Sequence, residues 1–214
     1  MKLSNLVLAS VLLAVAPAAM PARAAAPATA AQASPSKLVL DNSTRILSTL
    51  EERRAEFTAD RGKLEQFVSG EFNSMFDRDY AARQVLGRHG RGASDADIKL
   101  FADALADSLM RRYGSSLLDF NTRLRVRIKS ETTLPRGLGV KVASEMLRSG
   151  GEPIPVDYLM CKSGNTWKVF DVMVEGVSFV QTFRRQFDGE LSRKSIRQVA
   201  GELASGKVSA DAGR

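Results

Sequence analysis

The sequence predicts an α+β fold in which helices pack on a four-stranded, or slightly larger, antiparallel sheet. Apolar residues recur every three or four positions from 35 to 117, as in helices that bury one face. Strand-like segments follow from 123 to 174, and helical spacing returns from Ser178 to about residue 205. Helices that are segregated along the chain from a run of strands are typical of α+β domains.

The strongest strand signal lies between Pro153 and Val180. Two apolar runs, Ile154–Cys161 and Trp167–Val174, flank Gly164-Asn165, and such a pair accepts the positive φ of a tight hairpin turn. We expect the resulting register to pair Ser163 with Thr166, Met160 with Val169, Tyr158 with Asp171, and Val156 with Met173. Both faces of the hairpin are then largely apolar, which predicts that apolar groups cover the sheet on both sides.

The helices are expected in a fixed order. The first runs from about Pro35 to Thr58, and the third ends at Gly87, which suits the left-handed position after a helix. Side chains suited to cap the later helices are Asp60, Asp77, Ser94, Ser178 and, near the last helix, Ser192. The longest helix carries bulky apolar residues along one face: Ile98, Phe101, Leu105, Leu109, Tyr113 and Leu117.

The N-terminus has the pattern of a secretory signal peptide over residues 1–26. Lys2 supplies a positive charge, residues 6–16 form a short apolar run, and small residues precede Ala26. The run is too short to span a bilayer, and no cysteine follows it to carry a lipid anchor. The rest of the chain is expected to form a flexible lead-in at 27–36, a single domain at 37–205 and a frayed tail at 206–214.

Charge and cysteine content set further limits. A formal charge of +7 would suggest nucleic-acid binding in a cytosolic protein, but the signal peptide predicts export, so no nucleic-acid partner is expected. The single cysteine, Cys161, has no partner for an intramolecular disulfide. Four basic side chains share one face of the strand at 123–129. We expect that face to be solvated and to protect a strand edge, with docking to acidic headgroups or an acidic partner as the alternative.

Few residues could support catalysis. The chain has one histidine, His89, which excludes a multi-histidine metal site. Because it is expected in a loop, we do not expect a His-based triad either. Cys161 lies among apolar neighbours and is expected to be a core residue. Asp171 beside Tyr158 is expected to form a buried hydrogen bond rather than to act as a general base. We therefore predict no catalytic residue, no metal site and no cofactor.

Several short motifs occur in a specific order. They are Val85-Leu86-Gly87-Arg88, the helix from Phe101 to Arg112-Tyr113-Gly114, Pro153-Ile154-Pro155-Val156-Asp157-Tyr158, the Gly164-Asn165 turn with Trp167-Lys168-Val169-Phe170-Asp171-Val172, and Glu175-Gly176-Val177-Ser178. In this order and spacing they resemble the MlaC, or toluene-tolerance, family of periplasmic phospholipid-binding proteins. The resemblance covers roughly residues 40–205. One departure is the glycine-rich segment 88–92, where the family usually has an aromatic residue.

The resemblance implies a fold and a function. The fold is a twisted antiparallel sheet wrapped by helices, similar to the nuclear-transport-factor-like cone, with an apolar lipid cavity. The function is a periplasmic shuttle, a monomer without catalysis, that carries phospholipid and maintains outer-membrane lipid asymmetry. Its partners would be an inner-membrane MCE-domain ABC transporter complex and an outer-membrane lipoprotein–porin complex, contacted transiently. A hopanoid-associated branch of the same family is an alternative.

The same resemblance suggests which residues line the cavity. The sheet wall would consist of Val156, Tyr158, Val169 and Met173, and the helix wall of Leu105, Leu109, Tyr113 and Leu117. Glu175, Val177 and Phe179 would lie at the corner between sheet and helix. Two other classes remain open: a secreted enzyme on the same cone fold with Asp171 and Tyr158 as its polar centre, and a basic adaptor that binds an acidic partner.

Overall fold

The computed structural model describes residues 33–113, 118 and 123–211, all within one unit of the chain, residues 32–214. The predicted signal peptide lies outside these residues, as does Leu117. The helices are α1 (Pro35–Glu52), α2 (Arg54–Ala59), α3 (Arg61–Met75), α4 (Arg78–Leu86), α5 (Asp95–Tyr113), α6 (Phe179–Leu191) and α7 (Ile196–Ala204). The strands are β1 (Arg125–Thr133), β2 (Val140–Leu147), β3 (Ile154–Ser163), β4 (Thr166–Val174) and β5 (Val177–Ser178). None of these helices has the length and apolar character that crossing a membrane requires.

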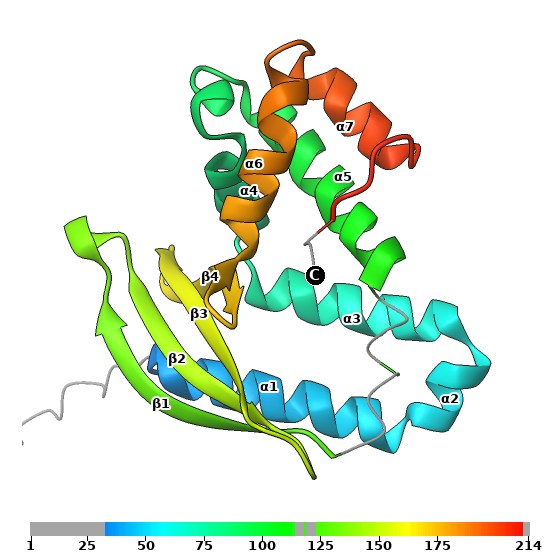
Figure 1. The fold of residues 1–214 in the computed structure, drawn as a ribbon, viewed down its shortest axis with the longest axis vertical. Helices are drawn as coiled ribbons and strands as arrows, with labels where there is room; N and C mark the ends of the chain where they lie inside the picture. The colour runs from blue at the N-terminus through cyan, green and yellow to red at the C-terminus, as the bar shows by residue number, and fades with distance from the viewer. Residues whose placement is uncertain (1–32, 114–117, 119–122, 212–214) are drawn as a thin grey trace, which may run out of the picture. The chain divides into compact units, whose positions relative to one another are not determined.

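The strands form one antiparallel sheet in the order β1-β2-β3-β4-β5, so the predicted α+β class is confirmed (Figure 1). The sheet is one strand larger than the four predicted, because a second tight turn follows β4. Glu175 and Gly176 both have positive φ, 51° and 82°, as in a type I′ hairpin turn. This turn folds β5 back onto β4, where Val177 pairs with Val174.

The central hairpin follows the predicted register only from its turn to the Met160–Val169 pair. Beyond it, Tyr158 pairs with Val172 and not with Asp171, so that part of the prediction is wrong. The cause is a β-bulge at Phe170, which adds one residue to β4 and moves every later residue to the other face. Phe170 is buried, and its ring meets Tyr80 of α4 edge to face at 5.1 Å. The residue that the bulge inserts into β4 thus packs against a helix that is distant in the sequence.

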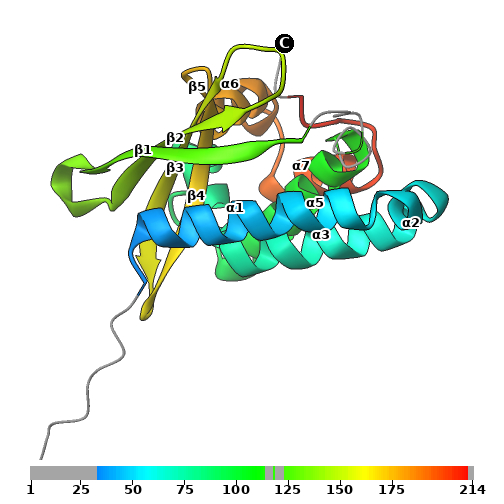
Figure 2. The ribbon, with the colours of Figure 1, turned by 90° about the horizontal axis from the view of Figure 1, so that it is seen from below.

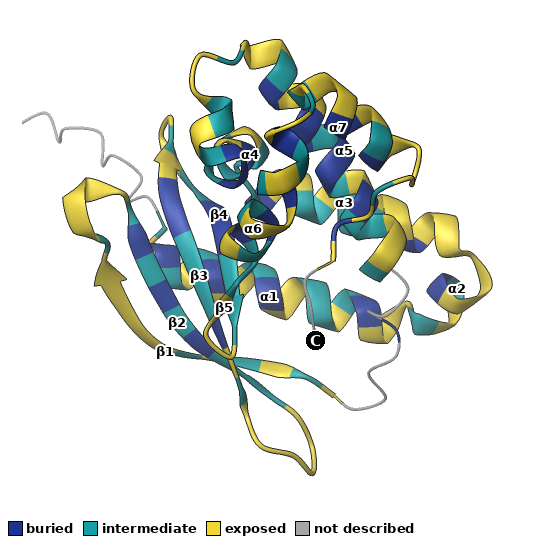
Figure 3. Cartoon of the chain, turned by 45° about the horizontal axis from the view of Figure 1, so that its top comes forward, coloured by how far each residue is buried: buried dark blue, intermediate teal, exposed yellow. Residues whose placement is uncertain are grey.

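The two faces of the sheet carry different side chains. The first, which we call the α1 face, carries Val140, Val142, Val156, Tyr158, Met160 and Val169. Helix α1 crosses it (Figure 2), and Val39 of α1 packs into a cluster with Val140, Val142, Met160 and Val169. The opposite face carries Lys141, Asp157, Leu159 and Asp171. Figure 3 shows that β1 is mostly exposed, whereas β2, β3 and β4 carry the buried residues.

Most helix starts agree with the predicted caps. Asp60, Asp77 and Ser178 each accept a hydrogen bond from a backbone N–H in the first turn of the helix that follows. The last helix starts slightly later than predicted, because Ser195, and not Ser192, is the N-cap. The predicted first helix is broken at Arg53 into α1 and α2. This break lets α3 return beside α1, where Arg45 is bonded to Glu71.

Apolar residues of the described part gather in three clusters. The helical cluster lies between α4, α5, α6 and α7, and its largest members are Phe101, Phe183 and Phe187. The second cluster lies between α1 and the sheet, and the third joins the end of α1 to α2 and α3. Figure 1 shows the helices that carry the helical cluster on the β4 side of the sheet, away from β1.

Residues 206–211, the described part of the predicted tail, make specific contacts with the helices. Ala210 is fully buried in the helical cluster, and its backbone N–H donates to Ser108 Oγ at 3.0 Å. The side chain of Gln186 accepts from the N–H of Asp211 and donates to the carbonyl of Ser209. Although this tail is polar in composition, Ala210 is buried in the helical cluster and Val208 packs against it.

Candidate functional site

The α1 face continues past its buried cluster toward the end of the sheet that carries the β2–β3 and β4–β5 turns. There its residues are aliphatic, yet they are only partly buried. We call this set the apolar strip; it consists of Val126, Met146, Ile154, Val172, Val174 and Val177. Val177 at its end is 49% exposed, although it follows closely on a buried face. The strip is therefore an apolar surface that lacks complete cover among the described residues.

The register brings four predicted site residues to this face. Val156 and Val169 are buried beside the strip, Tyr158 is half-buried between them, and Val177 lies at the strip's end. Met173 pairs with Asp157 on the opposite face, because the bulge at Phe170 shifts the register. The predicted four-residue sheet wall therefore does not share one face.

The predicted helix wall belongs largely to the helical cluster. Leu105 is buried within that cluster, and Leu109 and Phe179 pack at its margin, half-buried. The hydroxyl of Tyr113 donates to Asp211 Oδ1 at 3.1 Å. Leu117 lies outside the described residues. Leu109 and Tyr113 of the predicted helix wall, and Phe179 of the predicted corner, are thus only half-buried, and their contact with a ligand stays a prediction.

The Glu175-Gly176-Val177-Ser178 motif forms the corner between sheet and helix. Its first two residues make the hairpin turn, with the Glu175 side chain exposed. Its last two form β5, and the Ser178 side chain caps α6. The motif therefore fixes where Val177 emerges beside the apolar strip.

Tyr158 and Asp171 do not form the predicted polar centre. They lie on opposite faces, and the hydroxyl of Tyr158 instead lies 3.5 Å from Ser43 Oγ of α1. Burial raises the pKa of Tyr158, so its hydroxyl remains neutral. It is a weakly bonded polar group in an otherwise apolar wall.

Asp171 has a structural role at the start of α6. It accepts hydrogen bonds from Ser178 Oγ at 2.5 Å and from the backbone N–H of Val180 at 3.0 Å. Burial raises the pKa of Asp171, and these two hydrogen bonds lower it in part. Both carboxylate oxygens are occupied at a helix N-terminus, where an anion is favoured. This arrangement serves helix capping.

His89 and Cys161, the other residues considered for catalysis, also have structural roles. His89 Nε2 is hydrogen-bonded to Asp188 Oδ1 at 2.9 Å, which joins the α4–α5 connection to α6. Cys161 is buried, and burial raises the pKa of its thiol to about 11, which disfavours a thiolate. Within the described ranges, no three His, Cys, Asp or Glu residues come together in a group that could hold a metal ion.

The basic face of β1 is exposed, as the sequence predicts. Arg127 and Lys129 both bridge to Glu145 of β2, at 2.5 and 3.1 Å. The hydrogen bond from Arg127 is the main cause that holds the pKa of Glu145 below its usual value. Lys141 of β2 pairs with Asp157 of β3 at 3.3 Å. These cross-strand pairs form a polar ladder on the face away from α1.

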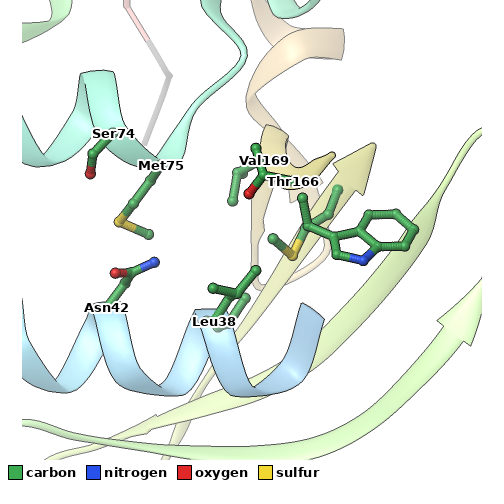
Figure 4. Close-up of a pocket in the computed structure, with 9 residues that line it drawn as sticks. Leu38, Asn42, Ser74, Met75, Thr166 and Val169 are labelled. Atoms are coloured by element: carbon green, nitrogen blue, oxygen red, sulfur yellow. The ribbon is translucent and has the colours of Figure 1, made fainter. Parts of the chain in front are cut away.

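A small pocket lies at the other end of the α1 face (Figure 4). Its volume is ≈ 70 Å³, and α1, the end of α3 and the β3–β4 hairpin line it. A drug-sized ligand fills roughly 300–1,000 Å³, so this pocket is too small for a diacyl lipid. Val169 is the one predicted site residue that contributes to it. Sequence reasoning missed the pocket because its three segments are distant in the chain and share no local pattern.

Comparisons with known proteins agree with this fold. A family model described as "MlaC protein" matches residues 40–205. The toluene tolerance protein ttg2D of Pseudomonas putida is 26% identical over 192 residues, covering 86% of this chain and 87% of the relative. The intermembrane phospholipid transport system binding protein MlaC of Haemophilus influenzae is 21% identical over 169 residues, covering 78% of each chain.

A solved structure gives the same result at the level of the fold. The phospholipid-binding protein of Ralstonia solanacearum, solved in complex with a phospholipid, superposes with a TM-score of 0.70 at 23% identity. The match covers 81% of this chain and 98% of that one. The family model spans well over half of the sequence. The chain therefore belongs to the MlaC family.

Proposed function

We propose that this protein is a periplasmic carrier that binds one phospholipid against the apolar strip and moves it between membranes without catalysis. The observation that carries the proposal is the strip itself. Its six aliphatic residues share a face with fully buried neighbours, yet they keep accessible surface. Contiguous apolar surface of this kind marks a ligand-binding or interaction site. The names of two similar proteins, which refer to phospholipid binding and intermembrane transport, support a lipid as the ligand.

The acyl chains would lie between the strip and the apolar side chains that face it. On the sheet we propose Val156, Tyr158 and Val177 as the contacts, with Val169 at the buried end. On the helices we propose Leu109 and Phe179, both half-buried. Met173 is left out because it lies on the opposite face. Few polar groups lie along this path, so headgroup selectivity should be low.

The energetics favour exchange at a membrane complex over release into water. Two acyl chains with about thirty methylenes would gain ~24 kcal/mol against water at ~0.8 kcal/mol each. That sum exceeds the practical ceiling of roughly 18–21 kcal/mol for non-covalent complexes, so it cannot be an affinity. The relevant reference is a bilayer, in which the same chains are already buried. A carrier therefore needs partners that receive the lipid directly.

The partners we propose are a transporter complex of the inner membrane and a complex of the outer membrane. The predicted signal peptide supports a periplasmic location, and the name of the relative from Haemophilus influenzae supports a transport system. The protein would act as a monomer that contacts each complex transiently.

The test is the cargo of the protein purified from a Gram-negative periplasm without detergent. Native mass spectrometry followed by lipid extraction should find about one glycerophospholipid per chain. The substitution Val177→Glu should remove it, because a carboxylate would then face the acyl chains. Since Val177 is 49% exposed, the variant should fold and melt cooperatively. A homogeneous empty wild-type protein, or one loaded only with hopanoid, would contradict the proposal.

Leu138→Glu is the matched control. Leu138 is 50% exposed and lies in the β1–β2 connection, at the other end of the sheet. It should keep its lipid. Loss of lipid from both variants would mean that any added surface charge disturbs loading, and the strip would then not be the site.

A further inference from the structure

The small pocket of Figure 4 has an apolar floor and a mixed rim. Val39, Met160 and Val169 form the floor and are almost completely buried. Trp167 and Leu38 are half-buried at the rim, and Ser74 and Thr166 are exposed there. The pocket thus opens outward between three segments, while its base belongs to the packed core under α1.

Volume and chemistry restrict what the pocket can hold. At ≈ 70 Å³ the pocket is far smaller than the roughly 300–1,000 Å³ of a typical small-molecule site, so it suits the end of a single side chain. Ordered water would need two to four polar partners. The Asn42 side-chain oxygen already accepts from Arg45, and Ser74 Oγ donates to the carbonyl of Glu71. The end of one aliphatic side chain fits the floor better than water does.

Some of the charged side chains around the pocket make ion pairs, and others do not. On the α1 side, Lys37 pairs with Asp41 and Arg45 pairs with Glu71. On the hairpin side, Lys162 Nζ lies 5.6 Å from the centroid of the Trp167 ring, and Lys168 Nζ donates to the carbonyl of Ser74. Neither of these two lysines makes an ion pair with any residue that the structure describes. Two cations without a carboxylate partner therefore contact residues that line the pocket.

We propose that this pocket is a docking site for a protein partner. The partner inserts the end of one aliphatic side chain between α1, α3 and the β3–β4 hairpin, and it presents carboxylates to Lys162 and Lys168. Trp167 flanks the inserted group, in keeping with the prominence of tryptophan in residues that dominate binding energy. The site lies at the opposite end of the sheet from Val177, so docking there leaves the end of the apolar strip accessible. The inference concerns a contact surface and does not depend on which ligand the strip holds.

A short acidic peptide tests the proposal with the intact mature protein. The probe is the blocked pentapeptide Glu-Asp-Leu-Asp-Glu, titrated while the emission of Trp167, the single tryptophan of the chain, is followed. We expect a saturable change in emission with a Kd below about 1 mM at low salt. Replacing the central leucine of the peptide by serine, or its acids by lysines, should weaken binding about tenfold or more.

Variants of the protein locate the binding site. Ser74→Phe places a ring over the pocket mouth and should abolish the signal, whereas Gln66→Phe, an exposed position of the same helix, should not. Lys162→Glu should weaken binding at least tenfold, and Arg91→Glu, exposed in the α4–α5 connection, should leave it unchanged. Lys162 is exposed, so its variant remains informative if Ser74→Phe folds poorly.

Several separate results would contradict the proposal. Equal binding of the leucine and serine peptides would show that the pocket plays no part. An absence of saturable change, or a signal that survives both Ser74→Phe and Lys162→Glu, would also refute it. Vesicles of phosphatidylglycerol and phosphatidylethanolamine serve as a further arm. If they shift Trp167 emission in the wild type and not in Ser74→Phe, the occupant is a membrane surface and a protein partner is excluded.

Discussion

The helical cluster and the apolar strip use similar side chains in opposite ways. In the helical cluster, Phe101 and Phe187 meet edge to face at 5.7 Å, and both are fully buried. In the strip, the aliphatic residues between Val126 and Val177 keep exposed surface although their neighbours on the same face are buried. The first region has the dense packing of an ordinary protein core, and the second keeps the apolar surface that we propose as the lipid-binding site.

The difference separates the sources of stability and of binding. Burial of apolar surface is the main favourable contribution to folding, so the helical cluster should contribute most to the free energy of unfolding. A partly exposed strip contributes less to folding and retains surface for a ligand. Changes in the two regions should therefore affect different measurements.

The largest expected effect comes from placing the same charge in each region. Val199 in α7 is fully buried in the helical cluster, so Val199→Glu would bury an unpaired carboxylate at a cost of several kcal/mol. That is a large part of a typical stability of about 5–15 kcal/mol, and the variant should be unfolded or aggregated by circular dichroism and gel filtration. Val177→Glu should remain folded. If both variants unfold, or both remain folded, the helical cluster and the apolar strip do not differ in packing as we describe.

A cavity in the helical cluster should have the next largest effect. Phe187→Ala removes a buried ring that contacts Phe101 and Phe183. Such truncations cost about 3–5 kcal/mol, which chemical denaturation would detect as a lower midpoint with an unchanged slope. The folded fraction should still carry lipid. Loss of lipid from a folded Phe187→Ala protein would show that the cluster and the site are coupled.

A smaller effect should appear in the pH dependence of stability. Because burial raises the pKa of Asp171 in the folded state, folding takes up protons at this carboxyl. Its contribution to stability is therefore complete below the unfolded pKa of about 3.9 and is lost as pH rises through the folded pKa. Asp171→Asn stays neutral and keeps an oxygen for the Val180 N–H. We expect the melting temperature of this variant, relative to the wild type, to increase as pH rises from about 4 toward 7.

Comparing the variant with the wild type at each pH cancels the contributions of other carboxyls. Those of Glu145 and Asp188 have the opposite sign, since their pKa values are lowered. A melting-temperature difference that shrinks as pH rises would mean that the ionised Asp171 stabilises α6.

The smallest effect is expected on the exposed polar ladder. Arg127 pairs with Glu145 near the surface, and exposed ion pairs contribute roughly 0–1 kcal/mol. Arg127→Ala should change the free energy of unfolding by no more than about 0.5–1 kcal/mol and leave the bound lipid in place. A larger loss in urea denaturation would show that β1 depends on its basic face.

Local signals made much of the fold predictable from the sequence. Asp60, Asp77 and Ser178 cap their helices within one turn, and the Gly164-Asn165 turn sets the start of the hairpin register. Each of these features depends on residues that are close together in the chain. The resemblance to the family added the sheet and helix arrangement around them.

Features that depend on distant contacts were not predictable. The bulge at Phe170 forms where its ring meets Tyr80 of α4, and it moved Met173 off the expected wall. Ala210 is held by Ser108, and no local pattern distinguishes it from a frayed end. For the candidate site, the sequence correctly placed Val156 and Tyr158 on one face but could not show that Leu105 belongs to the helical cluster.

The helical cluster also constrains the order in which the chain can fold. It joins α4 and α5, which precede the sheet, to α6, α7 and Ala210, which follow it. During synthesis, Phe101 cannot find Phe187 until nearly the whole polypeptide has emerged. In a nascent chain truncated before α6, α4 and α5 should therefore remain unpacked and sensitive to protease. Late assembly of this kind would keep the polypeptide in the unfolded form needed for the export that we propose.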